Sequence, residues 1–361
     1  MKTLRLNVDA KKTETPEFAA ALEKAAQILR KGGLVAFPTE TVYGLGANAL
    51  DAAAVERIFA AKGRPKWDPI IVHVCSLEMA RELVSAVSEP ATRLMQAFWP
   101  GPLTLLLARS AAIPDVVTAG RPLAGLRMPS HPVALELIRR AGVPIAAPSA
   151  NRFSHVSPTT AAHVLHDLDG RIDAVLDAGP ALHGVESTVL DPNQSPMLIY
   201  RPGAVTREMI RKVAGPAEIY AGRIEPSEMP TEALPSPGVG LRHYAPRARL
   251  VLLEASNPEP VPAAAELASR IAQAAGELGG EKVGVMLPAG IAAPADSAAL
   301  RLFNWGSWNA PKEMAQSLYA GLRALDEQGC TVILCPLPPH EGIGVAIRDR
   351  LRKAGTKGVR D

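Results

Sequence analysis

The sequence predicts an α/β protein built from two domains. At 361 residues the chain is longer than a single hydrophobic core usually spans. In both halves, short apolar runs that suit β-strands alternate with segments whose apolar residues recur at helical spacing. Between the halves, prolines punctuate residues 214–248 without a regular period, as in a linker. We therefore expect one domain over residues 1–213 and a smaller one over residues 249–361.

Composition and charge exclude several classes of protein. Hydrophobic residues make up 47% of the chain but aromatic residues only 4%, so aliphatic packing must dominate the cores. The net charge of +3 is too small to indicate nucleic-acid binding, although it suits phosphate-bearing substrates. Three cysteines without a C-x-x-C pair argue against a disulfide framework or a zinc ribbon. No signal peptide or membrane span is recognisable, so we expect a soluble, cytoplasmic protein without membrane contact.

The first elements lead into the stretch that organises the first domain. Residues 3–8 alternate as a strand does, and residues 16–31 carry an apolar stripe at helical spacing. Residues 34–37 form an apolar run that suits a buried strand. Pro38 ends this run because proline offers no backbone donor to a central sheet.

A polar loop and a helix follow this strand. Residues 39–46 place two threonines beside two glycines, so hydroxyl groups and approachable backbone amides can converge on one small polar ligand. Asp51 fits the N-cap of a helix that ends at Gly63. Lys62 and Arg64 lie at the end of this helix, where isolated cations are explained by the helix dipole alone.

Alternating patterns continue through the first domain. A second strand over residues 68–73 returns a carboxylate and an imidazole towards the first loop. We predict helices over residues 77–87, 90–98 and 131–141, and strands over residues 103–108, 123–129, 143–147 and 172–176, with two more near residues 190 and 200. Residues 157–160 form a helix cap whose amides suit a phosphate.

Polar residues stand where several of these strands end. Arg127 and Arg201 each end a strand, and Ser149 and Asn151 follow another. The ordinary explanations are exposed charges for the arginines and turn formers for Ser149 and Asn151. Strand ends that open into loops commonly hold ligands in α/β proteins, which favours one pocket lined by these residues.

The order of these motifs resembles the YrdC family, whose members make threonylcarbamoyl-AMP. The resemblance rests on Pro-Thr-Glu-Thr-Val-Tyr-Gly-Leu-Gly at residues 38–46, on Lys62-x-Arg64-Pro65, on Pro-Ile-Ile-Val-His at residues 69–73, and on Ser149-x-Asn151. It implies a YrdC-like first domain with a twisted mixed sheet and a parallel, Rossmann-like second domain. It also implies that the linker over residues 214–248 closes over the active site.

The implied activity is that of an L-threonylcarbamoyladenylate synthase, a nucleotidyltransferase. Such an enzyme joins L-threonine, bicarbonate and ATP into threonylcarbamoyl-AMP and releases pyrophosphate. Mg²⁺ would accompany the ATP. Other proteins would transfer the product to an adenosine next to the anticodon of tRNA, and a direct contact with tRNA is left open.

The resemblance also assigns roles to individual residues. The catalytic residues are Lys62 and Arg64. The threonine site comprises Thr41, His73, Arg127, Ala147 and Ser187. The ATP site comprises Lys62, Arg64, Asp68, Ser149, Asn151, Ser157 and Arg201, and the closing linker contributes Ser236, Arg242, His243 and Tyr244. The cations would offset the negative charge that grows on the triphosphate, and the planar fork of Arg127 suits a carboxylate.

Three positions qualify this assignment. Asp68 stands where asparagine is expected, and its carboxylate would repel phosphates unless it pairs with a cation or helps to hold the metal. Residues 239–241, Val-Gly-Leu, replace an expected Met-Lys-Tyr, which removes a basic residue from the linker. His73 is also explained as a core histidine with satisfied hydrogen bonds.

The second domain shows a simpler pattern. Strands over residues 249–254, 282–287 and 331–335 and helices over residues 262–278 and 311–328 indicate a small parallel α/β domain. Because both glycine-rich phosphate motifs are missing, we expect neither a dinucleotide site nor a P-loop. The closing basic helix over residues 342–353 is explained either as a contact for RNA or as a solvated charged face.

Two other functions compete with the synthase. One is a non-catalytic RNA-binding module, which the modest charge and the inward-facing cations disfavour as the whole function. The other is a hydrogenase-maturation carbamoyltransferase, which contains a similar domain. This chain shows neither the zinc-finger cysteine pairs nor the acylphosphatase segment of that protein.

Overall fold

The computed structural model describes residues 2–221, 233–234, 236, 244–256, 260–295 and 297–355, and these form two compact units. Unit 1 comprises Met1–Phe153, Ser157–Leu182 and Glu186–Gly240. Unit 2 comprises Ser154–Val156, His183–Val185 and Leu241–Asp361. The domain and linker ranges expected from the sequence stay predictions.

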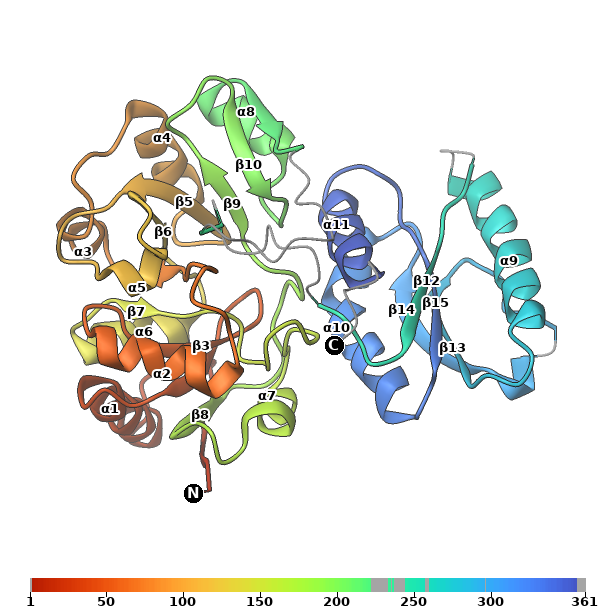
Figure 1. Ribbon diagram of the computed structural model, residues 1–361, viewed down its shortest axis with the longest axis horizontal. Helices are drawn as coiled ribbons and strands as arrows, with labels where there is room; N and C mark the ends of the chain where they lie inside the picture. Colours follow the sequence, from red (N-terminus) through yellow and green to blue (C-terminus); the bar gives the residue numbers. More distant parts are fainter. Residues whose placement is uncertain are drawn as a thin grey trace. The chain divides into compact units, whose positions relative to one another are not determined.

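Unit 1 is built on a mixed sheet of eleven strands. In spatial order these are β1 (Leu4–Asn7), β8 (Ala174–Asp177), β2 (Val35–Pro38), β3 (Tyr43–Asn48), β7 (Ile145–Ala146), β4 (Val72–His73), β6 (Leu123–Arg127), β5 (Leu103–Ala108), β9 (Thr188–Asp191), β10 (Met197–Arg201) and β11 (Ala217–Ile219). Several of these strands, among them β3, β5, β6 and β8–β10, are labelled in Figure 1. The sheet contains both parallel pairs, such as β4 with β6, and antiparallel pairs, such as β5 with β6. The predicted fold class, a twisted mixed sheet with helices, is confirmed.

Eight helices cover this sheet in the described part of unit 1. They are α1 (Pro16–Arg30), α2 (Ala52–Lys62), α3 (Leu77–Glu82), α4 (Glu89–Phe98), α5 (Asp115–Thr118), α6 (Pro132–Ala141), α7 (Ala161–Leu168) and α8 (Arg207–Ala214). Asp51 caps α2 by accepting from the amide of Ala53 at 3.0 Å, and Gly63 ends it in a left-handed conformation, as predicted. Thr160 caps α7.

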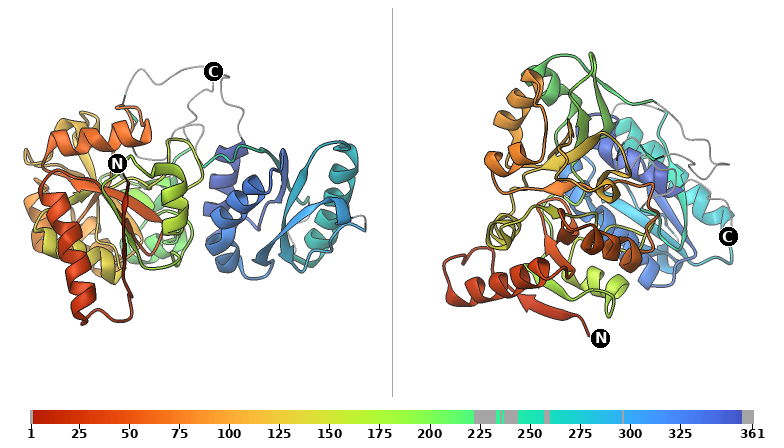
Figure 2. Two further views of the ribbon diagram at one scale, coloured as in Figure 1. Left: turned by 90° about the horizontal axis from the view of Figure 1, so that it is seen from below. Right: turned by 60° about the vertical axis from the view of Figure 1, so that its left-hand side comes forward.

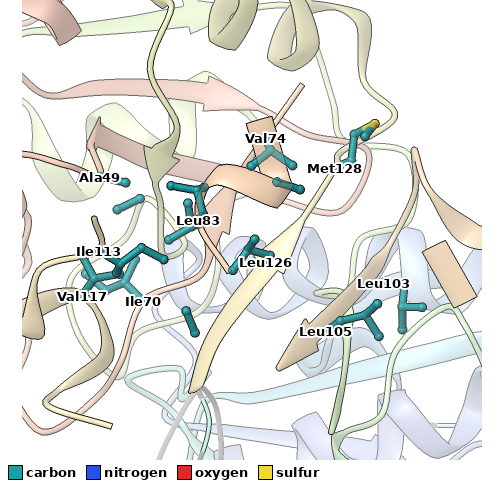
Figure 3. Close-up of a cluster of buried hydrophobic side chains, with 14 of the residues drawn as sticks. Ala49, Ile70, Val74, Leu83, Leu103, Leu105, Ile113, Val117, Leu126 and Met128 are labelled. Atoms are coloured by element: carbon teal, nitrogen blue, oxygen red, sulfur yellow. The ribbon is translucent and has the colours of Figure 1, made fainter. Parts of the chain in front are cut away.

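Helices pack against both faces of the sheet, so β2 is buried on both sides. Val35 and Phe37 point into a core shared with α1 and α6, which lie together in Figure 1. Ala36 points into the larger core formed with α2, α4, α7 and α8. Figure 3 shows this larger core, where Leu105 of β5 lies opposite Leu126 of β6. Aliphatic side chains therefore support the strands whose ends carry the site.

The polar loop after β2 is shorter than expected. Residues 43–46 belong to β3, which forms an antiparallel hairpin with β2, so the loop is confined to residues 39–42. A Cβ atom on Gly46 would lie 2.7 Å from Ile145 and 2.8 Å from Phe37. The prediction that both glycines open the backbone to a ligand is therefore wrong for Gly46, which is needed for close strand packing.

Other boundaries also differ from the predicted ones. The strand predicted over residues 68–73 is confined to Val72–His73. Residues 217–219, inside the predicted linker, form β11 and pair in parallel with β10. None of the helices in the described ranges combines the length and apolar character that a bilayer span needs.

Unit 2 contains a fully parallel sheet in the order β12 (Arg249–Leu253), β15 (Val332–Pro336), β13 (Val283–Ala289) and β14 (Arg301–Ser307). The helix α9 (Pro260–Glu277) covers one face, and α10 (Pro311–Glu327) and α11 (Gly344–Gly355) cover the other (Figure 2). The predicted parallel α/β architecture is confirmed. The edge strand β14 was missed because its residues, of which only Trp305 is buried, show no regular alternation.

Neither explanation of the basic helix fits its central arginines. Arg348 is buried, forms an ion pair with Glu254 and donates to the carbonyl oxygen of Pro338 at 2.8 Å. Arg350 is 1% exposed, and its guanidinium lies 5.2 Å from the ring centroid of Tyr244. Arg348 and Arg350 are therefore buried residues with partners in unit 2 and do not belong to a solvated charged face.

The larger core of unit 1 should be sensitive to a cavity in β5. Leu105 is fully buried, so Leu105→Ala should lower the free energy of unfolding by about 2–5 kcal/mol. The matched control is Leu50→Ala at a residue that is 41% exposed, which should cost at most about 0.5 kcal/mol. Urea denaturation measures both, and equal losses would contradict the assigned core.

Candidate active site

Parallel pairing of β4 with β6 sets His73 directly beside Arg127. On its other side, β4 pairs with β7, and the amide of Ala147 just after β7 donates to the carbonyl oxygen of Ile71 at 2.9 Å. Three of the residues predicted to bind threonine thus lie on adjacent strands. Sheet register, which sequence patterns show poorly, produces this arrangement.

Arg127 is held at the centre of a buried polar cluster. Its Nη1 donates to Thr41 Oγ1 at 3.0 Å and its Nε donates to the carbonyl oxygen of Gly101 at 3.3 Å. Its Nη2 lies 2.7 Å from Glu40 Oε1 in an ion pair whose side chains are both 4% exposed. Thr39 Oγ1 lies 2.8 Å from Thr41 Oγ1 and completes the cluster. An exposed surface charge is therefore excluded for Arg127.

Burial and charge fix the protonation of this cluster. Burial alone would raise the pKa of Glu40, but the adjacent Arg127 guanidinium outweighs it and lowers that pKa below the ordinary value. Burial, together with the charge of Arg127, lowers the pKa of His73 to about 3, so the imidazole is neutral at physiological pH. No described residue forms a full hydrogen bond with His73 Nδ1, but backbone groups of Ile71 and Ile145 interact with the ring and act to raise its pKa. Both explanations of His73 therefore stand.

A second polar cluster joins the end of α2 to the loop after β7. Lys62 Nζ donates to the carbonyl oxygens of Ser149 at 2.6 Å and of Asn151 at 2.5 Å. The two halves of the Lys-x-Arg and Ser-x-Asn signature thus meet through one ammonium group. Burial and the nearby charge of Arg64 lower the pKa of Lys62 well below its ordinary value. The contacts of Lys62 are those of a residue that holds the loop in place.

Asp68 lies among three cations. Its carboxylate forms an ion pair with Arg64 at 2.9 Å, and Arg64 also donates to the carbonyl oxygens of Asp68 at 3.1 Å and Pro69 at 2.8 Å. Burial raises the pKa of Asp68, while the charges of Arg64, Lys62 and Arg201 act in the opposite direction. The structure thus brings together cations that are far apart in the sequence.

Arg201 binds the loop that carries Ser187. Its Nε donates to the carbonyl oxygen of Ser187 and its Nη2 donates to Ser187 Oγ, both at 3.0 Å. A Cβ atom on Gly203 would lie 2.4 Å from the amide nitrogen of Thr188, so only glycine fits there. Arg201 is 5% exposed, which excludes the solvated strand-end charge.

The two clusters adjoin through the chain turn at Gly101 and Pro102. Arg127 donates to the carbonyl oxygen of Gly101, while the carbonyl oxygen of Pro102 accepts from the amide of Thr188 at 3.0 Å. Thr188 follows Ser187, which Arg201 binds. The residues predicted to bind threonine and those predicted to bind ATP therefore form two adjacent clusters in unit 1.

Three polar residues of the site were not predicted from the sequence. Glu40 pairs with Arg127, Thr104 Oγ1 lies 2.8 Å from Ser187 Oγ, and Glu186 accepts from Ser157 Oγ at 2.6 Å. Thr104 could have been noticed as the one polar side chain in the apolar run of β5. Glu40 stands between two threonines inside the motif itself.

The predicted linker residues are only partly described. Ser236 is fully buried and belongs to unit 1. Tyr244 belongs to unit 2, where its ring stacks on Tyr319 with centroids 5.8 Å apart. Arg242 and His243 lie outside the described residues. Closure of the linker over the site stays a prediction.

Comparison with known proteins assigns this chain to a family. A family model named for Sua5, YciO and YrdC and described as telomere recombination matches residues 27–203. A second model, described as threonylcarbamoyl-AMP synthase, C-terminal domain, matches residues 205–356. The threonylcarbamoyl-AMP synthase of Bacillus subtilis is 42% identical, over 98% of each chain. The chain belongs to the Sua5/YrdC family.

Further Sua5/YrdC proteins extend the similarity to both units. The threonylcarbamoyl-AMP synthase of Pyrococcus abyssi is 42% identical over 91% of this chain and 92% of its own. The crystal structure of Pyrococcus abyssi Sua5 complexed with L-threonine has a TM-score of 0.86 at 40% identity and covers 98% of both chains. The enzyme of Schizosaccharomyces pombe is 37% identical over 94% of this chain and 89% of its own.

The buried His73 should make stability depend on pH. Its folded-state pKa of about 3 lies below the unfolded value of 6.5, so its contribution is complete above 6.5 and is lost as the pH falls towards 3. Between about pH 7 and about pH 5.5 the loss should be about 1.2 kcal/mol. Urea denaturation of the wild type and His73→Gln measures it. An equal pH dependence in both proteins would contradict a neutral, buried His73.

Proposed function

We propose that this chain is an L-threonylcarbamoyladenylate synthase, which joins L-threonine, bicarbonate and ATP into threonylcarbamoyl-AMP and releases pyrophosphate. The observation that carries the proposal is the buried group of Lys62, Arg64 and Arg201 around Asp68, next to the Arg127 cluster. Membership of the Sua5/YrdC family supports the same activity. The site thus combines groups for an amino acid with groups for a triphosphate.

The Arg127 cluster would bind threonine. The guanidinium plane is fixed by Thr41 and Gly101, and a fixed fork suits the two oxygens of a carboxylate. Neutral His73 stands beside it in the sheet and can contribute a hydrogen bond without adding charge. Ala147 and Ser187 would complete the threonine site.

The second cluster would bind ATP and stabilise the reaction. Arg64 and Arg201 would offset the charge that develops at the phosphates, and Lys62 would keep Ser149 and Asn151 in position. Asp68 and Ser157 would complete the ATP site. Fixed cations stabilise this charge well, because they need no reorganisation when the reaction occurs.

The reaction would proceed in two steps. The threonine ammonium group first loses a proton, and the resulting amine attacks the carbon of bicarbonate and forms a carbamate with loss of water. A carbamate oxygen then attacks the α-phosphorus of ATP, and the bond from that phosphorus to the oxygen bridging to the β-phosphate breaks. Because the carbamate is already an anion, the second step depends on positioning and on exclusion of water.

Mg²⁺ fits this site only as part of the nucleotide complex. Among the described residues, no group of three or more histidine, cysteine or acidic side chains could hold a metal ion. Mg²⁺ is usually bound by one or two carboxylates together with substrate phosphates, and Asp68 and Glu186 are the carboxylates on the nucleotide side. The ion would supply positive charge at the triphosphate.

The product and the compartment complete the proposal. Threonylcarbamoyl-AMP is an activated mixed anhydride, which other proteins would transfer to an adenosine next to the anticodon of tRNA. We place this reaction in the cytoplasm, because Cys75, Cys330 and Cys335 are all free thiols. Direct contact with tRNA or a membrane is not part of the proposal.

Product analysis tests the activity. The purified protein is incubated with L-threonine, ¹³C-bicarbonate, Mg²⁺ and ATP, and the mixture is examined by mass spectrometry. We expect threonylcarbamoyl-AMP that carries the label, together with pyrophosphate, only when all components are present. Absence of the product, with tight salt-dependent RNA binding instead, would favour the RNA-binding alternative.

Neutralising the buried ion pair should remove activity while the fold is kept. The double variant Arg64→Gln/Asp68→Asn deletes one charge of each sign, so the net charge of the buried cluster is unchanged. We expect its kcat for pyrophosphate release to fall about 10²–10³-fold. The control is Lys66→Ala, whose side chain is 71% exposed and should leave kcat unchanged. Wild-type turnover in the double variant would remove Arg64 from the catalytic site.

A substitution that changes the shape of the Arg127 side chain but keeps its charge should affect the binding of threonine and not that of ATP. Arg127→Lys keeps the positive charge beside Glu40 but loses the planar fork. We expect the KM for threonine to rise about 10- to 100-fold, with the KM for ATP nearly unchanged. Steady-state kinetics with each substrate varied in turn gives both constants. An unchanged KM for threonine would contradict the role in carboxylate binding.

A further inference from the structure

We propose that Glu40 binds the α-ammonium group of threonine, so that Glu40 and Arg127 together recognise the zwitterionic amino acid. The inference rests on the proposed function and deepens it, because it names the groups that select the substrate before carbamate formation. The buried carboxylate of Glu40 has no role in the reaction proposed above.

The backbone around Glu40 is held in one conformation. Thr39 Oγ1 donates to the carbonyl oxygen of Val42 at 2.7 Å and accepts from the amides of Thr41 at 3.2 Å and Val42 at 3.3 Å. Glu40 lies inside this closed loop between β2 and β3, which are both buried. The loop hydrogen bonds fix the backbone at Glu40, and the ion pair with Arg127 orients its side chain, as specific binding requires.

Glu40 retains capacity to accept hydrogen bonds. Its Oε1 lies 2.7 Å from Arg127 Nη2, and the carboxylate also interacts with backbone groups of Glu40 and Ser130, although none of these contacts has the geometry of a full hydrogen bond. An ionised carboxylate offers about four acceptor positions. Burying such a group with unused acceptors is costly unless a ligand supplies donors. An ammonium group supplies three donors and the opposite charge.

The neighbouring charges also suit a zwitterion. Arg127 and Glu40 form a neutral pair, so an amino acid can align its carboxylate with Arg127 and its ammonium group with Glu40 without adding net charge. His73 and His131 also face Glu40; burial lowers the pKa of each, so both imidazoles are neutral near pH 7. A carboxylic acid without an α-amino group would meet Arg127 but would also be repelled by Glu40.

Carbamate formation would then reverse the charge next to Glu40. The ammonium form of threonine and bicarbonate together yield the carbamate anion, one water molecule and one proton. The lowered pKa of Glu40 makes it a poor acceptor for that proton, which leaves to solvent. The carbamate is repelled by Glu40 and attracted towards Lys62, Arg64 and Arg201. Glu40 would thus favour movement of the new anion towards ATP.

Binding without turnover tests the inference. Equilibrium dialysis with labelled L-threonine, and competition by (R)-3-hydroxybutanoate, which is threonine without its amino group, gives the affinity ratio of the two ligands. We expect the wild type to prefer threonine by about 100-fold or more and Glu40→Gln to prefer it by less than about 10-fold. The matched control, Glu56→Gln at an exposed carboxylate, should keep the wild-type ratio.

The outcomes separate the inference from the proposed function. Equal weakening of both ligands in Glu40→Gln would mean that Glu40 only positions Arg127, and the inference would be wrong while the synthase activity stands. A wild type that binds no threonine would contradict the proposed function itself. Should Glu40→Gln not fold, Glu40→Gln/Arg127→Gln removes both buried charges, and a ratio that stays near the wild-type value in this variant would overturn the inference.

Discussion

The site depends on one electrostatic constraint, which is the burial of three cations around Asp68. Removing ions from water is costly, and like charges repel strongly where the dielectric constant is low. The ion pair of Asp68 with Arg64 and the carbonyl oxygens that bind Lys62 offset this cost. The cations are therefore in position before a triphosphate arrives. An asparagine at this place would supply hydrogen bonds but no negative charge.

Buried charges are also paired in the threonine cluster, but there the net charge is zero. There a single cation, Arg127, pairs with a single anion, Glu40, and the cluster is neutral. The sheet makes the two sides neighbours, because β4 pairs with β6 and the turn at Gly101 and Pro102 contacts both Arg127 and Thr188. A neutral subsite beside a positive one suits a reaction in which a zwitterion becomes an anion and then meets ATP.

Local signals predicted the elements that local chemistry controls. The helix α2 was recognisable from Asp51 at its start and Gly63 at its end, and β5 from an apolar run interrupted only by Thr104. Features that depend on distant partners were not recognisable. Gly46 was assigned to a ligand loop because the sequence does not show that Phe37 and Ile145 press against it. Glu40 was missed because its partner lies 87 positions away in the chain, and chemical motifs alone do not show such pairing.

The measurement that tests the account most directly is a crystal structure with L-threonine and a non-hydrolysable ATP analogue bound together. The account predicts both ligands in unit 1, with the threonine carboxylate on Arg127 and the triphosphate on Arg64 and Arg201. It also predicts that the gap between the threonine nitrogen and the α-phosphorus has room for one carboxyl group and for nothing larger. Ligands bound on separate surfaces, or a triphosphate away from these arginines, would contradict it.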